Sequence, residues 1–171
     1  MSGLSHVNEH GQPRMVDVSA KPVSLRRAVA TGFIRMRAET CALVAANQIA
    51  KGNVLTCAEI AGVMGGKKTA ELIPLCHLLP LDSVVVECRL EQTGVRAVAT
   101  TICTGRTGVE MESLTAVSVA LLTVYDMCKA VDKEMRIEEI SLLEKTKKSN
   151  CVTQASLPAN EQARIPAPLK S

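Results

Sequence analysis

Aromatic residues are almost absent from this chain of 171 residues, which has one phenylalanine, one tyrosine and no tryptophan. Single-stranded nucleic acids are bound largely by stacking their bases on aromatic side chains, so this scarcity argues against nucleic acid as a partner. The formal net charge of +3 is also too small to predict a broad basic surface. We expect a basic pocket for a small anion instead.

Cysteines at metal-binding or redox spacing are missing as well. The seven cysteines are an odd number, and no two of them form a Cys-x-x-Cys pair. Neither a disulfide framework nor a zinc site is therefore indicated, and we predict no metal site. We expect most of the cysteines to be small buried apolar residues.

The sequence also lacks a long hydrophobic run and the apolar core of a signal peptide. No apolar stretch approaches the roughly 20 residues that span a bilayer, and residues 1–16 are largely polar. The content of 47% hydrophobic and 22% charged residues fits one compact domain. We therefore predict a cytoplasmic protein with no membrane partner, whose single domain at 15–149 lies between flexible segments at 1–14 and 150–171.

The hydrophobic pattern predicts an α+β fold. In chain order, the predicted elements are a strand at 15–19, helices at 25–47 and 54–72, a hairpin at 84–103, a helix at 114–131 and a strand at 136–143. This order predicts a ferredoxin-like βαββαβ sandwich with an additional helix, in which an antiparallel sheet packs against helices. The helix at 114–131 is apolar on nearly every face, which predicts that part of it forms a subunit interface.

His77 is a candidate for ligand binding, because Pro74 ends the preceding helix and a rigid turn can then present the imidazole. The alternative is a histidine that is hydrogen-bonded within the fold, which is the more common role for an isolated case. A metal site formed by Cys76 and His77 is disfavoured, because adjacent residues rarely bind one ion.

A glycine-rich turn directly precedes two carboxylates, Glu110 and Glu112. Free backbone N–H groups in such a turn can meet a ligand, and a carboxylate can accept hydrogen bonds from a guanine-type N–H edge. Acidic residues in the first turn of a helix also interact favourably with the helix macrodipole. The motif alone does not separate these two roles.

Asp126 and Lys129 form a stronger candidate pair, because the i, i+3 spacing places both on one helix face. The other faces of this helix are apolar, so desolvation would shift the proton affinity of Lys129 and suit it to acid–base chemistry. A P-loop is disfavoured, since no Walker-type motif is present. Further cations occur near the ends of predicted elements, where a phosphate clamp would form: Lys51, Lys67, Lys68, Lys145, Lys147 and Lys148.

Five sequence runs together resemble the signature segments of the MoaC family of pyranopterin synthases. They occur in family order across residues 14–149. The runs are Met-Val-Asp-Val-Ser at 15–19, Lys51-Gly, Lys67-Lys-Thr with Leu-Ile-Pro-Leu-Cys-His77, Thr-Gly-Val-Glu-Met-Glu112 with Leu-Thr-Ala, and Tyr-Asp-Met-Cys-Lys129.

The resemblance implies an enzyme of molybdenum cofactor biosynthesis that rearranges a small-molecule nucleotide, 3′,8-cyclo-7,8-dihydroguanosine triphosphate. Pyrophosphate leaves and a cyclic phosphate forms. No cofactor is required, although Mg²⁺ is compatible with the triphosphate. The resemblance further implies a homo-oligomer, a hexamer arranged as a trimer of dimers.

Catalytic roles are implied for Lys51, Asp126 and Lys129, which would exchange protons with the substrate. The family's substrate contacts, together with the carboxylates and lysines described above, predict a larger binding set. It comprises Leu75, Cys76, His77, Glu110, Met111, Glu112, Lys67, Lys68 and Lys145.

The sequence departs from the family pattern in two places. Leu78 follows His77 where proline is usual, which affects the rigidity of that turn. The segment 145–150 reads Lys-Thr-Lys-Lys-Ser-Asn, one residue shorter than the usual glycine-containing loop. The closing of this loop over phosphates is therefore expected to differ.

Two other functions compete with the enzyme hypothesis. A binding module could sense a nucleotide or small anion without converting it, and an oligomeric scaffold would explain the apolar helix. The presence of Lys51, Asp126 and Lys129 together favours an enzyme, because binding alone does not need an acid–base group beside a phosphate clamp.

The spacing of Glu112 and Asp126 bears on assembly. They are 14 residues apart, which corresponds to about 21 Å along a straight helix. One substrate reaches both only if Glu112 lies in a loop that folds back, or if the two residues come from different subunits. The apolar helix between them favours a site shared between chains.

Overall fold

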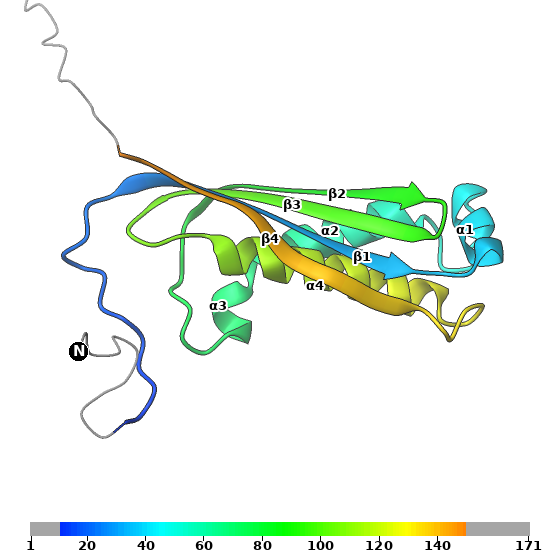
Figure 1. Cartoon of the computed structure of the whole chain (residues 1–171), viewed down its shortest axis with the longest axis horizontal. Coiled ribbons are helices and arrows are strands. Elements are labelled where there is room, and N and C mark those ends of the chain that lie inside the picture. Colours follow the sequence, from blue (N-terminus) through cyan, green and yellow to red (C-terminus); the bar gives the residue numbers. More distant parts are fainter. Residues whose placement is uncertain (1–10, 150–171) are drawn as a thin grey trace, which may run out of the picture.

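Residues 11–149 are described by a computed structural model, in which a four-stranded sheet is covered on one face by helices (Figure 1). The predicted tail at 150–171 and most of the predicted segment at 1–14 lie outside the described residues. The elements are β1 (Ser24–Arg35), α1 (Ala38–Ala45), α2 (Val54–Lys67), α3 (Thr69–Leu72), β2 (Leu81–Glu91), β3 (Gly94–Gly105), α4 (Glu110–Cys128) and β4 (Arg136–Ser149).

The strands lie in the order β2-β3-β1-β4, and every neighbouring pair is antiparallel. With helices between β1 and β2 and between β3 and β4, this is the predicted βαββαβ arrangement. The first crossover contains three helices instead of one, which includes the predicted additional helix. The predicted α+β class is confirmed.

The prediction for the first part of the chain is wrong in two elements. Residues 15–19 form no strand, and the first half of the helix predicted at 25–47 is β1, with only α1 being helical. Ala28–Ile34 are buried on both faces of the sheet, so the alternation that identifies a half-buried strand is missing. On the face away from the helices, Phe33 is covered by the guanidinium groups of Arg35 and Arg96, at 5.7 and 4.9 Å from the ring centroid.

The later elements follow the prediction more closely. The helix predicted at 54–72 is confirmed, although it divides at Lys68 into α2 and α3, and the hairpin predicted at 84–103 is confirmed as β2 and β3. α4 begins at Glu110, four residues earlier than predicted, and β4 continues to Ser149 instead of ending at residue 143. The last part of β4 was missed because its lysine-rich sequence lacks an apolar pattern, yet it pairs with β1 as far as Ser24.

α4 packs against the sheet beside α2 and carries much of the core. Its residues Ala116, Val117, Ala120, Leu121 and Val124 are completely buried, and each buried valine or leucine stabilises the fold by roughly 1.5–3 kcal/mol. The helix is long and apolar enough to cross a membrane by composition alone, but 56% of that stretch is buried inside the protein. It is therefore a core helix.

Glycines let α2 approach α4 closely. A Cβ atom added at Gly65 would lie 2.6 Å from the side chain of Val119, and one at Gly62 would lie 2.9 Å from the carbonyl oxygen of Ala116. Both distances are too short for real Cβ contacts, so only glycine fits. This close approach holds α2 beside the first turns of α4.

Candidate active site

Two lysines flank Asp126 at the C-terminal end of α4. The Nζ atom of Lys129 lies 2.7 Å from Oδ1 of Asp126, and Nζ of Lys51 lies 2.6 Å from Oδ2. Lys51 also donates a hydrogen bond of 2.9 Å to the backbone carbonyl of Asp126. The three predicted catalytic residues are thus brought together, although Lys51 is 75 residues away in sequence.

The loop between α1 and α2 holds Lys51 in this position. Asn47 adopts a positive φ of 54° after α1, and Gly52 has a φ of 100°, a conformation that favours glycine. Ile49 is buried in the core between them, and the Asn53 side chain accepts a hydrogen bond from the backbone N–H of Thr56 to cap α2. The loop is therefore fixed at both ends and in its middle.

The ion pairs determine the protonation of this cluster. Hydrogen bonds from Lys129 and then Lys51 lower the pKa of Asp126 to about 2. In return, the hydrogen bond to Asp126 raises the pKa of Lys129. At neutral pH the cluster therefore contains a carboxylate and protonated Lys129.

The expected desolvation of Lys129 is wrong. Its side chain is 54% exposed, as is that of Asp126, because both lie on the open side of the last turn of α4. The pKa of Lys129 is instead shifted by its charged partner. The contact with Asp126 therefore favours the protonated form of Lys129.

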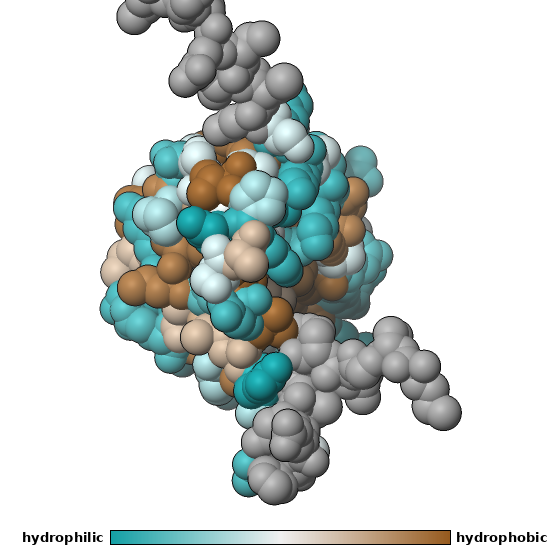
Figure 2. Space-filling model, turned by 90° about the vertical axis from the view of Figure 1, so that its left-hand side faces the viewer, coloured by the Kyte–Doolittle hydropathy of each residue, from teal (hydrophilic) through white to brown (hydrophobic). Residues whose placement is uncertain are grey.

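A second group of predicted residues meets at the other end of α4. The α3–β2 connection, the β3–α4 loop and the first turn of α4 line an open cavity of about 250 Å³. Figure 2 faces this end of the molecule, where hydrophobic and hydrophilic residues are interspersed. The cavity is lined by Leu75, Cys76, His77, Leu79, Thr107, Gly108, Glu110, Met111 and Glu112.

Glu112 is the buried acid of this cavity, with 5% of its surface exposed. Burial raises its pKa, and the nearby charge of Glu110 acts in the same direction. Burial also raises the pKa of Cys76, again with a contribution from Glu112. Cys76 is therefore a neutral thiol, suited to contact with a ligand and not to nucleophilic attack.

His77 is partly buried, and its Nε2 lies 2.8 Å from the backbone carbonyl of Val16, to which it donates in that contact. The imidazole thus faces the cavity while being anchored by the segment before β1. His77 can therefore form a hydrogen bond within the fold and line the cavity at the same time, so the two alternatives do not exclude each other.

The predicted cations are distributed unevenly around the cavity. Lys145 forms an ion pair with Glu110, and Lys67 lines a small hollow together with His77 and Glu112. Lys68 lies elsewhere, on an apolar groove between α2 and α4. The lysines therefore do not form one cluster.

Arg26 on β1 is a further basic residue at this end that sequence reasoning missed. It is paired in register with Cys103 of β3 and Lys147 of β4. Its Nη2 atom lies 3.3 Å from the carbonyl of Arg106, and its buried Nε has no hydrogen-bond partner. Only a correct prediction of β1 would have placed Arg26 beside the predicted lysines.

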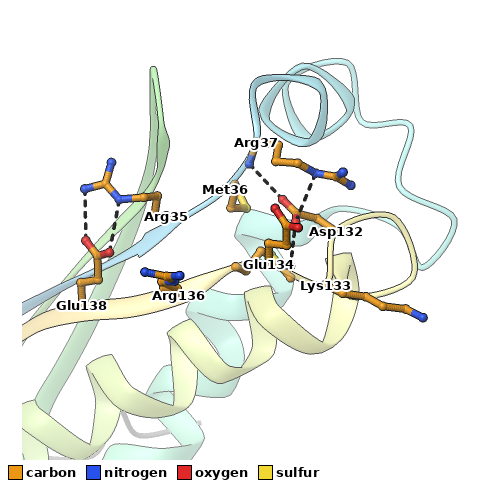
Figure 3. Close-up of a pocket in the computed structure, with 9 residues that line it drawn as sticks. Arg35, Met36, Arg37, Asp132, Lys133, Glu134, Arg136 and Glu138 are labelled. Atoms are coloured by element: carbon orange, nitrogen blue, oxygen red, sulfur yellow. Dashed lines mark hydrogen bonds and ion pairs between the residues drawn. The ribbon is translucent and has the colours of Figure 1, made fainter.

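A larger hollow lies at the other end of the sheet (Figure 3) and was not predicted. It has a volume of about 710 Å³ and is formed by the end of β1, the α4–β4 loop and the start of β4. Its lining consists of Arg35, Met36, Arg37, Asp132, Lys133, Glu134, Met135, Arg136 and Glu138.

The two groups of predicted residues do not meet within one chain. Glu112 and Asp126 both belong to α4, and their separation of 14 residues corresponds to about 21 Å along the axis. The alternative in which Glu112 lies in a loop that folds back is therefore wrong.

The chain is similar to proteins of known name. A sequence model of the MoaC family matches residues 15–148. A cyclic pyranopterin monophosphate synthase from Roseiflexus sp. (strain RS-1) is 54% identical, over 85% of this chain and 94% of that protein. One from Cereibacter sphaeroides (strain KD131 / KCTC 12085) is 56% identical, over 84% and 91%. Molybdenum cofactor biosynthesis protein 1 of Drosophila melanogaster is 54% identical over 85% of this chain, which corresponds to 26% of that longer protein.

Proposed function

The chain belongs to the MoaC family, and on that premise we propose that the two ends of α4 supply complementary halves of its active site. As an enzyme of molybdenum cofactor biosynthesis, it forms cyclic pyranopterin monophosphate. The proposed substrate is 3′,8-cyclo-7,8-dihydroguanosine triphosphate, from which pyrophosphate leaves. The single observation that carries the proposed mechanism is the contact of both Lys51 and Lys129 with one carboxylate.

The chemistry begins with the proton that Lys129 holds. A lysine whose pKa is raised by a carboxylate donates a proton when a substrate group of suitable basicity approaches. Asp126 remains ionised. It holds the side-chain nitrogens of Lys51 and Lys129 close together, so that both can form hydrogen bonds to one ligand. The lysines exchange protons with ring nitrogens and sugar hydroxyls, and Asp126 orients them.

The other half of the site binds the substrate. The carboxyl of Glu112 and the backbone around Met111 meet the N–H edge of the purine, while His77 and Cys76 line the same cavity. Lys67 and Lys145 flank the cavity and hold phosphate oxygens. Lys145 must exchange its contact with Glu110 for one with phosphate.

Two subunits are needed to bring these halves together. If two α4 helices pack antiparallel across a two-fold axis, residues at equal distances from the axis lie opposite each other. The midpoint between Glu112 and Asp126 is Val119, which lines an apolar groove of about 270 Å³ with Met64 and Leu72. Leu122 is 57% exposed on the same helix. This apolar surface supports contact with a second copy at the required place.

The proposed assembly is a homo-oligomer, a hexamer formed as a trimer of dimers with active sites at a dimer interface. The reaction requires no cofactor, and Mg²⁺ is compatible with the triphosphate. The protein works in the cytoplasm, with neither nucleic acid nor membrane as a partner. The core position of α4 supports a soluble protein.

The test of this function uses purified protein and substrate generated enzymatically in the same vessel. We expect release of pyrophosphate together with cyclic pyranopterin monophosphate, and neither product with Lys129→Ala. A protein that binds the nucleotide without releasing pyrophosphate would be a binding module, and the proposed function would be wrong.

A further inference from the structure

Asp132 is a completely buried carboxylate in the α4–β4 loop, at the base of the large hollow (Figure 3). Its Oδ2 accepts hydrogen bonds from the backbone N–H of Arg37 at 2.9 Å and from the hydroxyl of Thr40 at 3.1 Å. Its Oδ1 accepts from the backbone N–H of Glu134 at 3.1 Å and lies 3.3 Å from Nε of Arg37. Both oxygens are therefore fully engaged.

These contacts join two elements that are distant in sequence. Arg37 is the N-cap residue directly before α1, and its own side chain does not cap that helix. Asp132 instead accepts from the backbone N–H of this N-cap residue and from the hydroxyl of Thr40 in the first turn, and its negative charge is favourable near the helix N-terminus. The backbone N–H of Asp132 donates to the carbonyl of Cys128 at 3.0 Å, and Arg37 donates to the carbonyl of Val131. The start of α1 is thereby tied to the end of α4.

The same two elements carry the lysine cluster. Asp126 lies in the last turn of α4 and Lys129 directly follows that helix, whereas α1 leads into the loop that presents Lys51. Cys41 of α1 and Cys128 of α4 belong to one core cluster with Ile49 of that loop. Because Lys51 and Asp126 are 2.6 Å apart, a small movement of α1 relative to α4 would separate them.

We propose that Asp132 is a positioning residue for catalysis: it holds α1 against the end of α4 so that Lys51 reaches Asp126. The expected effect on the reaction rate rests on the proposed function, whereas the expected effect on the position of Lys51 does not. Asp132 acts through Arg37 and Thr40, and it does not touch the substrate. Loss of its hydrogen bonds releases α1 and lets Lys51 withdraw from Asp126.

The test compares Asp132→Asn with the wild-type protein and with Glu134→Gln. Asparagine keeps the shape of the side chain but can accept hydrogen bonds through one atom only. The hydrogen bonds that Asp132 accepts through one of its two oxygens are therefore lost. Glu134→Gln removes the same charge from an exposed side chain of the same loop, and it is the matched control. Thr40→Val, which removes a single hydrogen bond, is the second variant if Asp132→Asn does not fold.

The decisive readout is the pKa of Asp126, followed by NMR of its carboxyl carbon. With Lys51 withdrawn, this pKa should rise towards its value in Lys51→Ala, and adding Asp132→Asn to Lys51→Ala should cause no further rise. The value of kcat should fall roughly 10- to 100-fold, as expected for a misplaced catalytic group, with little change in KM. Glu134→Gln should match the wild type in both respects.

A folded Asp132→Asn protein whose Asp126 keeps the wild-type pKa overturns the proposal. So does a normal kcat in Asp132→Asn while Lys51→Ala is inactive, because the positioning would then not matter. If Lys51→Ala itself keeps a normal rate, the failure lies in the proposed function of Lys51 and also removes the kinetic basis of the positioning role.

Discussion

The two ends of α4 place carboxylates of similar intrinsic acidity in opposite environments. Near the N-terminus, burial raises the pKa of Glu112, which lines a cavity. Near the C-terminus, Asp126 is open to solvent and two lysines lower its pKa to about 2. The same type of side chain is therefore shifted in opposite directions at the two ends, which is the difference on which the proposed division into a binding half and a proton-transfer half rests.

The largest effect on the reaction rate is expected from substitutions in the lysine cluster at the C-terminal end of α4. Replacement of Lys51, Asp126 or Lys129 by alanine should lower kcat by roughly 10²- to 10⁴-fold, as for loss of a general acid or base. Each side chain is about half exposed, so the unfolding temperature should hardly change. Rates of pyrophosphate release and thermal unfolding of the same samples check both parts. A near-normal rate in any of the three variants would remove that residue from the catalytic assignment.

A smaller effect is expected at the N-terminal end. Glu112→Gln keeps the shape of the cavity but weakens hydrogen bonds to the purine, each worth about 1.5–3 kcal/mol when one partner is charged. We expect KM to rise roughly tenfold or more, with a smaller change in kcat. Steady-state kinetics measure this split. A loss confined to kcat would show that both ends of α4 take part in the chemistry.

A substitution that disturbs packing at the middle of α4 should lower the free energy of unfolding and not affect the catalytic residues directly. Gly65→Ala forces a Cβ atom to within 2.6 Å of Val119, and overpacking of this kind costs about 1–3 kcal/mol. Denaturant unfolding measures the change. The compensating variant Gly65→Ala/Val119→Ala should recover part of the loss, because it restores space. An unchanged stability of Gly65→Ala would mean that α2 and α4 are not packed as tightly as described.

The smallest expected effect is a difference in pH dependence. The raised pKa of Glu112 means that the folded protein binds this proton more tightly than the unfolded chain does. Its contribution is therefore favourable below the unfolded pKa and is lost as pH rises through the folded pKa. The stability of Glu112→Gln relative to wild type should thus increase as pH rises through this range. Unfolding free energies measured from acidic to neutral pH test the sign, and a relative decrease would show that the folded protein does not raise the pKa of Glu112.

The sequence runs that resemble the family were sufficient to find both ends of α4. Lys51, Asp126 and Lys129 do meet, and Leu75–His77 do line a cavity with Glu112. The protonation of the C-terminal end was not predictable, because an apolar helix does not reveal that its last turn opens to solvent. The desolvation expected for Lys129 therefore proved wrong.

Other features were hidden because they depend on contacts between distant segments. Both faces of β1 are buried, so its sequence lacks the alternation that identifies a strand. Because β1 was not predicted, Arg26 was not predicted as a residue of this site either. Asp132 bonds to a backbone N–H that is 95 residues away, and no local pattern marks such a contact. Sequence reasoning succeeded where short motifs carried the information, and it failed where tertiary packing did.

The most direct test of the shared site mixes two inactive proteins, Glu112→Ala and Asp126→Ala, after verifying that subunits exchange. A hybrid dimer has one intact site, so random mixing should restore about a quarter of wild-type activity. A mixture of Asp126→Ala and Lys129→Ala is the matched control and should stay inactive, because both changes affect the same half-site. Recovery in the first mixture only is the predicted result. If verified hybrids of Glu112→Ala and Asp126→Ala remain as inactive as their parents, the two ends of α4 do not form one active site across subunits.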